Sequence, residues 1–89
     1  MAISILIADD HGLIRTGLRA LLQEETGISV VGEAEDGYAA LRRIAELKPD
    51  IVLMDISLPG LSGIDVTRQV RDISPVTRVL MLTVHEDEG

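Results

Sequence analysis

The hydrophobic pattern of the chain alternates between short continuous apolar runs and segments of helical periodicity. The first run, at residues 3–8, is followed by apolar residues at Ile14, Leu18 and Leu22, the i, i+4, i+8 spacing of an amphipathic helix. This alternation repeats and predicts the order βαβαβαβ. Continuous apolar strands are typical of strands buried on both faces, and helical crossovers join parallel neighbours with right-handed connections. We expect strands at residues 3–8, 28–34, 51–54 and 79–82.

Turn and capping residues predict where the helices begin and end. Gly27 can end the first helix. Asp36 can cap the second helix, which Pro49 closes. Ser62 followed by Asp65 resembles a capping box at the start of the third helix, with Asp in place of the usual Glu or Gln. These positions fit the helices expected between the strands.

Composition limits the fold and the function. A chain of 89 residues, 46% of them hydrophobic, can form one small domain with a real core. A net charge of −7 argues against binding nucleic acid or anionic lipid through the overall field. The absence of cysteine excludes disulfides and a thiol nucleophile and fits a cytoplasmic location. The apolar runs are too short to span a membrane.

Acidic residues follow two of the apolar runs directly. Asp9 and Asp10 end the first run, and Asp55 ends the third. The carboxyl ends of parallel strands meet at one edge of a sheet, where ligands bind, so these carboxylates are expected to converge. Such a pocket suits Mg²⁺, which prefers carboxylates, water and phosphate. The alternative is that the aspartates are helix caps and a solvated rim, which explains one residue of the pair but not three together.

Other phosphate and cofactor motifs do not fit. Gly12 and Gly17 have the spacing of a phosphate-binding loop, but Leu18 stands where the essential lysine belongs. The dinucleotide-binding glycine pattern is absent after the first strand. His11 and His85 could be metal ligands or general bases. They lack metal-ligand spacing, which favours a helix-start residue and an exposed loop residue.

The motifs together resemble the receiver domain of two-component response regulators over the whole length of the chain. The resemblance lies in IADDH at residues 7–11, LMDI at 53–56, LPGLSG at 58–63 and MLT at 81–83. The segments ADDH at 8–11, VGEA at 31–34 and TVH at 83–85 are most similar to the NarL/FixJ subfamily. Members of that subfamily typically carry a LuxR-type helix-turn-helix domain after the receiver.

The resemblance implies a role for each acidic residue. Asp55 would be the phosphoacceptor, a carboxylate nucleophile. Mg²⁺ would be bound directly by Asp10 and Asp55, through a water by Asp9, and by the backbone carbonyl of Ser57. Thr83 would donate its hydroxyl to a phosphoryl oxygen and act as the switch. The domain would be a signalling module rather than an enzyme, with self-phosphorylation and self-dephosphorylation as its only chemistry.

The resemblance also implies a fold and partners. The fold would be a flavodoxin-like, doubly wound parallel sheet of order 2-1-3-4. The phosphoryl donor would be a sensor histidine kinase. DNA would be bound only through a helix-turn-helix domain absent from this sequence, so that phosphorylation controls transcription.

Residues 1–89 are expected to form a receiver that is incomplete at its C-terminal end. The fifth strand and helix of the family, and the lysine between them, do not occur in the sequence. The fourth strand would then be an open edge, which favours a homodimer or a swapped or edge-paired oligomer. Two alternatives remain open: an interaction or folding unit without phosphotransfer, and an unrelated magnesium phosphatase. A magnesium phosphatase of that kind normally has a DxD spacing, whereas Asp9 and Asp10 are adjacent.

Overall fold

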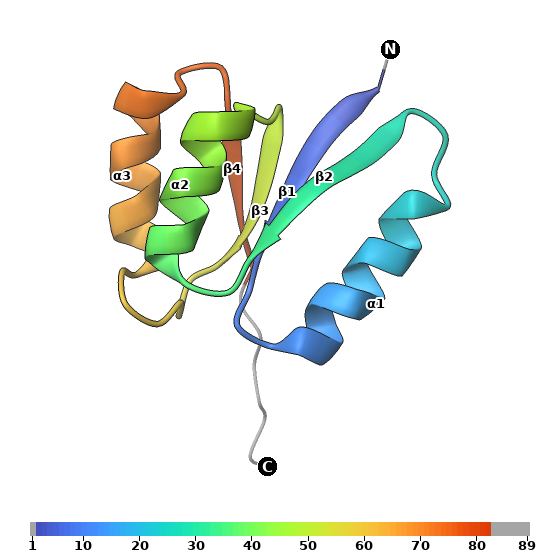
Figure 1. The fold of residues 1–89 in the computed structure, drawn as a ribbon, viewed down its shortest axis with the longest axis horizontal. Helices are drawn as coiled ribbons and strands as arrows, with labels where there is room; N and C mark the ends of the chain where they lie inside the picture. Colours follow the sequence, from blue (N-terminus) through green and yellow to red (C-terminus); the bar gives the residue numbers. More distant parts are fainter. Residues whose placement is uncertain (1, 83–89) are drawn as a thin grey trace.

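The computed structural model describes residues 2–82. In this part of the chain, four parallel strands form one sheet in the order β2-β1-β3-β4, which confirms the predicted fold (Figure 1). Crossover helices of this kind place the carboxyl ends of all four strands at the same edge. The elements are β1 (Ile3–Ala8), α1 (Gly12–Gln23), β2 (Ile28–Ala34), α2 (Gly37–Leu47), β3 (Ile51–Asp55), α3 (Gly63–Ile73) and β4 (Arg78–Leu82).

The helices lie on both faces of the sheet. Figure 1 shows α1 on one face and α2 beside α3 on the other. The main core forms between the sheet and the α2–α3 layer, because alternate residues of β1 and β3 point toward those helices. The buried residues of this core are Leu6, Ala8, Ala34, Ala40, Ile44, Val52, Met54, Leu58, Val66 and Val70.

No helix among the described residues has the length and apolar character needed to cross a membrane.

The face of the sheet under α1 is less well covered. Ile5 and Ile7 of the central strand β1 are buried there, but no residue of α1 in the described chain is buried. On the edge strand β4, Leu80 is 52% exposed and Met81 39% exposed. Burial on both faces therefore holds for the central strand β1 but not for β4, the strand expected to form an open edge. Within the described residues, β4 has a strand neighbour on one side only.

Two of the predicted helix starts are confirmed, and one helix end is corrected. The Asp36 carboxylate accepts a hydrogen bond from the Ala39 N–H at 2.7 Å. Ser62 Oγ accepts from the Asp65 N–H at 3.3 Å and donates to the Asp65 carboxylate at 3.1 Å. Helix α1 ends at Gln23, four residues before the predicted stop. Gly27 instead takes a φ of +89° and accepts from the Ile3 N–H at 2.7 Å, which aligns β1 with the turn before β2.

The first residue of α2 touches the loop that follows β3. The N–H of Gly37 donates to the Pro59 carbonyl at 3.1 Å. A Cβ on Gly37 would lie 2.0 Å from the carbonyl oxygen of Leu61, so this approach requires glycine. The contact fixes the loop that carries residues 56–62 against the start of α2.

Replacement of Gly37 by alanine is expected to destabilise the domain. The clash is with backbone, which cannot move aside cheaply, so we expect a loss of about 1–3 kcal/mol of unfolding free energy. Gly17→Ala is the matched control, because a Cβ there meets nothing within 4 Å on helix α1. That change should stabilise the helix by about 0.5–1 kcal/mol. Urea unfolding measures both values, and equal midpoints for the two variants would contradict the close contact.

A polar clamp joins β1 and β3 at their amino ends. The Asp50 carboxylate accepts from the backbone N–H of Ser4 at 2.8 Å and from its hydroxyl at 3.0 Å. The Asp50 N–H donates back to Ser4 Oγ at 2.9 Å. These bonds favour the charged carboxylate and hold the pKa of Asp50 below its ordinary value. The clamp lies at the end of the sheet opposite the acidic pocket and has a structural role.

The clamp predicts a pH-dependent difference in stability. Because the folded-state pKa of Asp50 is lowered, its contribution is present above the unfolded-state pKa of about 3.9 and is lost as pH falls through the folded value. Asp50→Asn should therefore unfold at lower urea concentration than the wild type at neutral pH. The gap between the two midpoints should narrow below about pH 4. A gap that stays constant down to the lowest accessible pH would contradict this account.

Candidate functional site

The carboxyl ends of β1 and β3 bring the three predicted aspartates together. The two strands are neighbours, with Ala8 paired to Met54, so the residues that follow lie side by side. Asp9, Asp10 and Asp55, together with His11, each offer a ligand atom, and these atoms lie within 4.8 Å of one another. We call these four residues the acidic cluster. The convergence inferred from the strand ends is therefore present.

The cluster has a buried side and an exposed side. Asp9 is fully buried and Asp55 is 2% exposed. The side chains of Asp10 and His11 are 37% and 43% exposed. Two buried carboxylates close to a third are unfavourable unless a cation or proton compensates their charge. A compensating cation would enter from the side of Asp10 and His11.

One oxygen of the buried Asp9 carboxylate has no partner in the described chain. Oδ1 accepts two hydrogen bonds from His11, from its backbone N–H and from ring Nδ1, both at 2.8 Å. Oδ2 is buried and makes no hydrogen bond to any described residue. Buried carboxylate oxygens almost always have partners, so an oxygen of this kind suits the role of a ligand to a cation or an acceptor for an ordered water. The donor set therefore fits a divalent metal ion.

The two oxygens of Asp55 have different surroundings. Oδ1 accepts a hydrogen bond from the Ser57 N–H at 3.0 Å, which fixes the carboxylate relative to the loop after β3. Oδ2 lies 3.7 Å from His11 Nδ1, on the side of the acidic cluster. The start of α3 packs behind this residue, because a Cβ on Gly63 would lie 2.7 Å from the Asp55 carbonyl oxygen. These contacts position Asp55 with Oδ2 toward the cluster.

His11 is the member of the cluster that the sequence did not favour as a ligand. It precedes α1 as predicted, but it makes no side-chain cap, and its ring lies 3.2 Å from Asp10 Oδ1. The hydrogen bond to Asp9, followed by the charge of Asp10, raises the pKa of His11. The available signal was its position directly after the aspartate pair, where a short turn returns the ring to the strand end.

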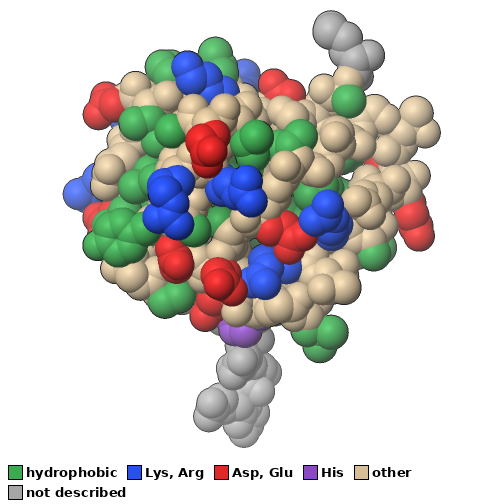
Figure 2. All heavy atoms as spheres, viewed as in Figure 1, with side chains coloured by type: hydrophobic (Ala, Val, Ile, Leu, Met, Phe, Trp, Pro, Cys, Tyr) green, Lys and Arg blue, Asp and Glu red, His purple; other side chains and the backbone are tan. Residues whose placement is uncertain are grey.

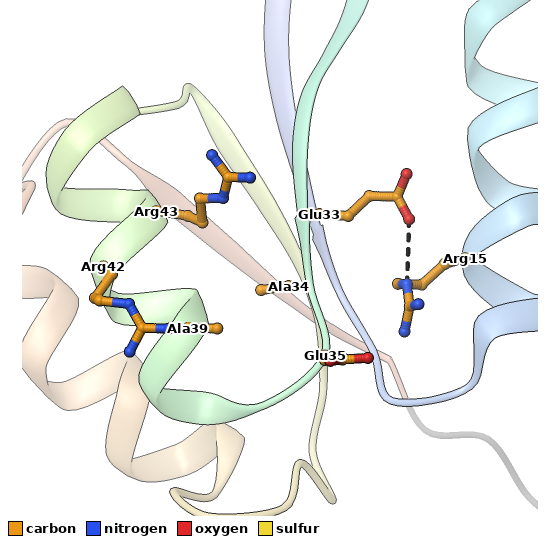
Figure 3. Close-up of a pocket in the computed structure, with 7 residues that line it drawn as sticks. All are labelled: Arg15, Glu33, Ala34, Glu35, Ala39, Arg42 and Arg43. Atoms are coloured by element: carbon orange, nitrogen blue, oxygen red, sulfur yellow. Dashed lines mark hydrogen bonds and ion pairs between the residues drawn. The ribbon is translucent and has the colours of Figure 1, made fainter.

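An arginine on α1 supports the strand end from the other side. Arg15 donates through Nη1 to the Asp9 carbonyl at 2.6 Å and through Nε to Glu33 at 3.1 Å. Glu33 also pairs with Arg19. Figure 3 shows Glu33 on β2 pointing toward α1 and the Arg15 guanidinium. This network fixes the backbone at Asp9 relative to α1 and β2.

Two cavities lie near the cluster. One of about 460 Å³ adjoins it through Asp10, and its lining is completed by Glu35, Asp36, Tyr38, Pro59 and Gly60. The other, of about 320 Å³, lies along β2 between α1 and α2 (Figure 3). It contains no member of the cluster. The second cavity is lined by Arg15, Glu33, Ala34, Glu35, Ala39, Arg42 and Arg43.

On the face of the molecule seen in Figure 2, basic and acidic side chains are interspersed, without a continuous patch of one sign.

The remaining predicted site residues are placed only in part. Ser57 lies in the turn after β3, and its N–H is the donor to Asp55 described above. Thr83, the predicted switch residue, lies outside the described residues, as does His85. Leu82, the last described residue, pairs with Asp55 across the sheet, and its carbonyl accepts from the Ile56 N–H at 3.2 Å.

Comparison with known proteins gives a consistent result. The family described as "Response regulator receiver domain" matches residues 5–89. The response regulator GacA of Pseudomonas syringae pv. syringae is 42% identical over 86 residues, which are 97% of this chain and 40% of that protein. The chain thus spans well under half the length of the curated relatives that it matches.

Solved structures agree with the sequence relatives. The signal receiver domain of NarL from Mycobacterium tuberculosis has a TM-score of 0.89 and 38% identity, covering 98% of this chain and 70% of that one. RcsB from Salmonella enterica serovar Typhimurium, bound to the promoter rprA with the phosphomimetic BeF3−, has a TM-score of 0.84 and 28% identity. That match covers 93% of this chain and 43% of RcsB. The similarity to NarL agrees with the subfamily predicted from the motifs.

Proposed function

The chain belongs to the response regulator receiver domain family, and we propose that it accepts a phosphoryl group on Asp55 from a sensor histidine kinase. The observation that carries this proposal is the buried Asp55, held by the Ser57 N–H at Oδ1 and grouped with two further carboxylates. Oδ2 would be the nucleophile, because Oδ1 is already engaged. A phosphorus–oxygen bond forms at Oδ2 as the phosphorus–nitrogen bond of the donor breaks, and the leaving imidazole takes up a proton.

We propose Mg²⁺ as the cofactor of this step. Asp10 and Asp55 would bind it directly, Asp9 through a water, and Ser57 through its backbone carbonyl. Asp9 Oδ2, which has no hydrogen-bond partner among residues 2–82, and the set of oxygen donors support this choice. When bound, the ion supplies positive charge that lets an anionic carboxylate approach an anionic phosphoryl group. The Ser57 N–H keeps Asp55 in place throughout.

We propose that the phosphorylated domain signals through residues beyond the cluster. Thr83 would donate its hydroxyl to a phosphoryl oxygen and change position on phosphorylation, a role that rests on the family resemblance. The output would be transcription control in the cytoplasm by a DNA-binding domain. The promoter complex of RcsB and the greater length of the relatives support this assignment.

A second candidate function is an interaction unit without phosphotransfer, favoured by the exposed edge of β4. Leu80 and Met81 present apolar surface beside an edge strand, a known template for pairing with another chain. We expect the 89-residue chain to form dimers or larger oligomers through this edge. Light scattering at high micromolar concentration measures the mass. A folded, stable monomer would contradict the expectation.

Labelling with acetyl phosphate separates the two functions. The chain incubated with acetyl phosphate and Mg²⁺ should gain about 80 Da by intact mass spectrometry. Chelation of the metal before labelling should prevent the gain. A chain that is folded by circular dichroism and yet stays unlabelled with Mg²⁺ present would favour the interaction unit.

A further inference from the structure

We propose that His11 is itself a metal ligand, so that the acidic cluster binds Zn²⁺ or Ni²⁺ through one nitrogen and its carboxylate oxygens. The inference rests on the metal site of the proposed function but not on phosphotransfer. It assigns to His11 a preference for transition metals that the three aspartates alone would not give.

The distances around the ring fit coordination. His11 Nδ1 lies 2.8 Å from Asp9 Oδ1, 3.2 Å from Asp10 Oδ1 and 3.7 Å from Asp55 Oδ2. Around an ion with metal–ligand bonds of about 2.1 Å, adjacent ligand atoms are separated by about 3.0 Å in octahedral and 3.4 Å in tetrahedral geometry. One ion can therefore contact the imidazole nitrogen and the carboxylates after small side-chain movements. The ion would take the place of the Nδ1 proton that is donated to Asp9 Oδ1, and the neutral ring would keep its one N–H proton on Nε2.

The buried side of the cluster supplies a second, independent observation. Asp9 is fully buried, and its Oδ2 has no hydrogen-bond partner in the described chain. His11 contacts the other oxygen of that carboxylate, so the ring does not satisfy Oδ2. A bound cation would satisfy this oxygen and neutralise the neighbouring charges at once. The exposed His11 and Asp10 side chains leave an entry path from the solvent.

The type of donor atom determines which ions His11 would bind more tightly. Imidazole is a good ligand for Zn²⁺, Ni²⁺ and Cu²⁺, whereas Mg²⁺ prefers oxygen donors and retains water. Loss of the ring should thus weaken Zn²⁺ and Ni²⁺ binding and leave Mg²⁺ binding nearly unchanged. A cluster that can hold both kinds of ion makes Zn²⁺ a competitor of Mg²⁺ at the same carboxylates.

The rival explanation is that His11 only donates a hydrogen bond to Asp9. His11→Asn separates the two roles, because the Asn amide can keep a donor near Asp9 but lacks an imidazole nitrogen. It removes no helix cap, since His11 makes no side-chain cap. His85→Asn is the matched control, because His85 is the one other histidine of the sequence.

Equilibrium titrations of the full chain with Mg²⁺, Zn²⁺ and Ni²⁺ test the proposal. His11→Asn should raise the dissociation constants of Zn²⁺ and Ni²⁺ by about tenfold or more, at least the loss typical for a supporting residue of a metal ligand. Its Mg²⁺ constant should change by less than about twofold, since the oxygen donors remain. His85→Asn should leave all three constants as in the wild type. Electron paramagnetic resonance of bound Cu²⁺ should show nitrogen coupling that His11→Asn removes.

Two results would overturn the proposal: unchanged Zn²⁺ affinity in His11→Asn, or an equal loss in His85→Asn. Acetyl phosphate labelling is measured separately and does not decide the matter. A chain that binds Zn²⁺ through His11 but takes up no phosphoryl group would refute the proposed function and leave this inference standing. Phosphoryl labelling together with Zn²⁺ binding that does not depend on His11 would refute this inference and leave the proposed function standing.

Discussion

Asp55→Asn is expected to abolish phosphoryl uptake from acetyl phosphate while the chain stays folded. The substitution keeps the size of the side chain and its acceptor for the Ser57 N–H, but it removes the nucleophilic oxygen at Oδ2. Intact mass spectrometry should show the gain of about 80 Da in the wild type and none in the variant. Far-ultraviolet circular dichroism of the two proteins should be the same.

Asp72→Asn is the matched control, because it makes the same chemical change at an exposed position on α3. This variant should be labelled at the wild-type rate. Labelling of Asp55→Asn at that rate would remove Asp55 from the role of phosphoacceptor.

Mg²⁺ is expected to raise the melting temperature of the chain by several degrees. The ion binds the assembled cluster in preference to the unfolded chain, so at about ten times its dissociation constant it adds about 1.4 kcal/mol. For a domain of this size, that corresponds to roughly 6–11 °C. The shift should depend on Asp10, whose carboxylate lies on the entry side of the cluster.

Differential scanning calorimetry of the wild type, Asp10→Asn and Asp72→Asn, with Mg²⁺ and with chelator, makes the comparison. Asp10→Asn should lose most of the Mg²⁺-dependent shift, and Asp72→Asn should keep it. Identical shifts in all three proteins would show that Mg²⁺ acts outside the cluster.

The fold and the three aspartates could be predicted because local signals coincide with the tertiary arrangement. Asp9, Asp10 and Asp55 follow apolar runs directly, and parallel strands connected by helices bring such ends to one edge. The helix caps at Asp36 and Ser62 could also be predicted, because a cap depends only on residues within one turn.

The contributions of other residues depend on the relative positions of separate elements, which no local pattern specifies. Arg15 reaches the Asp9 carbonyl only because α1 lies against the end of β1, and the Ser4–Asp50 clamp depends on the register of β1 and β3. At Gly27 a local pattern is present, but the prediction drawn from it is wrong. A residue suited to end a helix instead forms the turn before β2, since α1 had already ended.

The most direct test of the account is to map the phosphoryl group within the labelled chain. After acetyl phosphate and Mg²⁺ treatment, borohydride reduces an acyl phosphate but leaves a phosphohistidine intact, and tandem mass spectrometry of the fragments locates the change. We predict reduction at Asp55 alone. Modification at Asp9 or Asp10, or a borohydride-resistant phosphoryl group on His11, would contradict it.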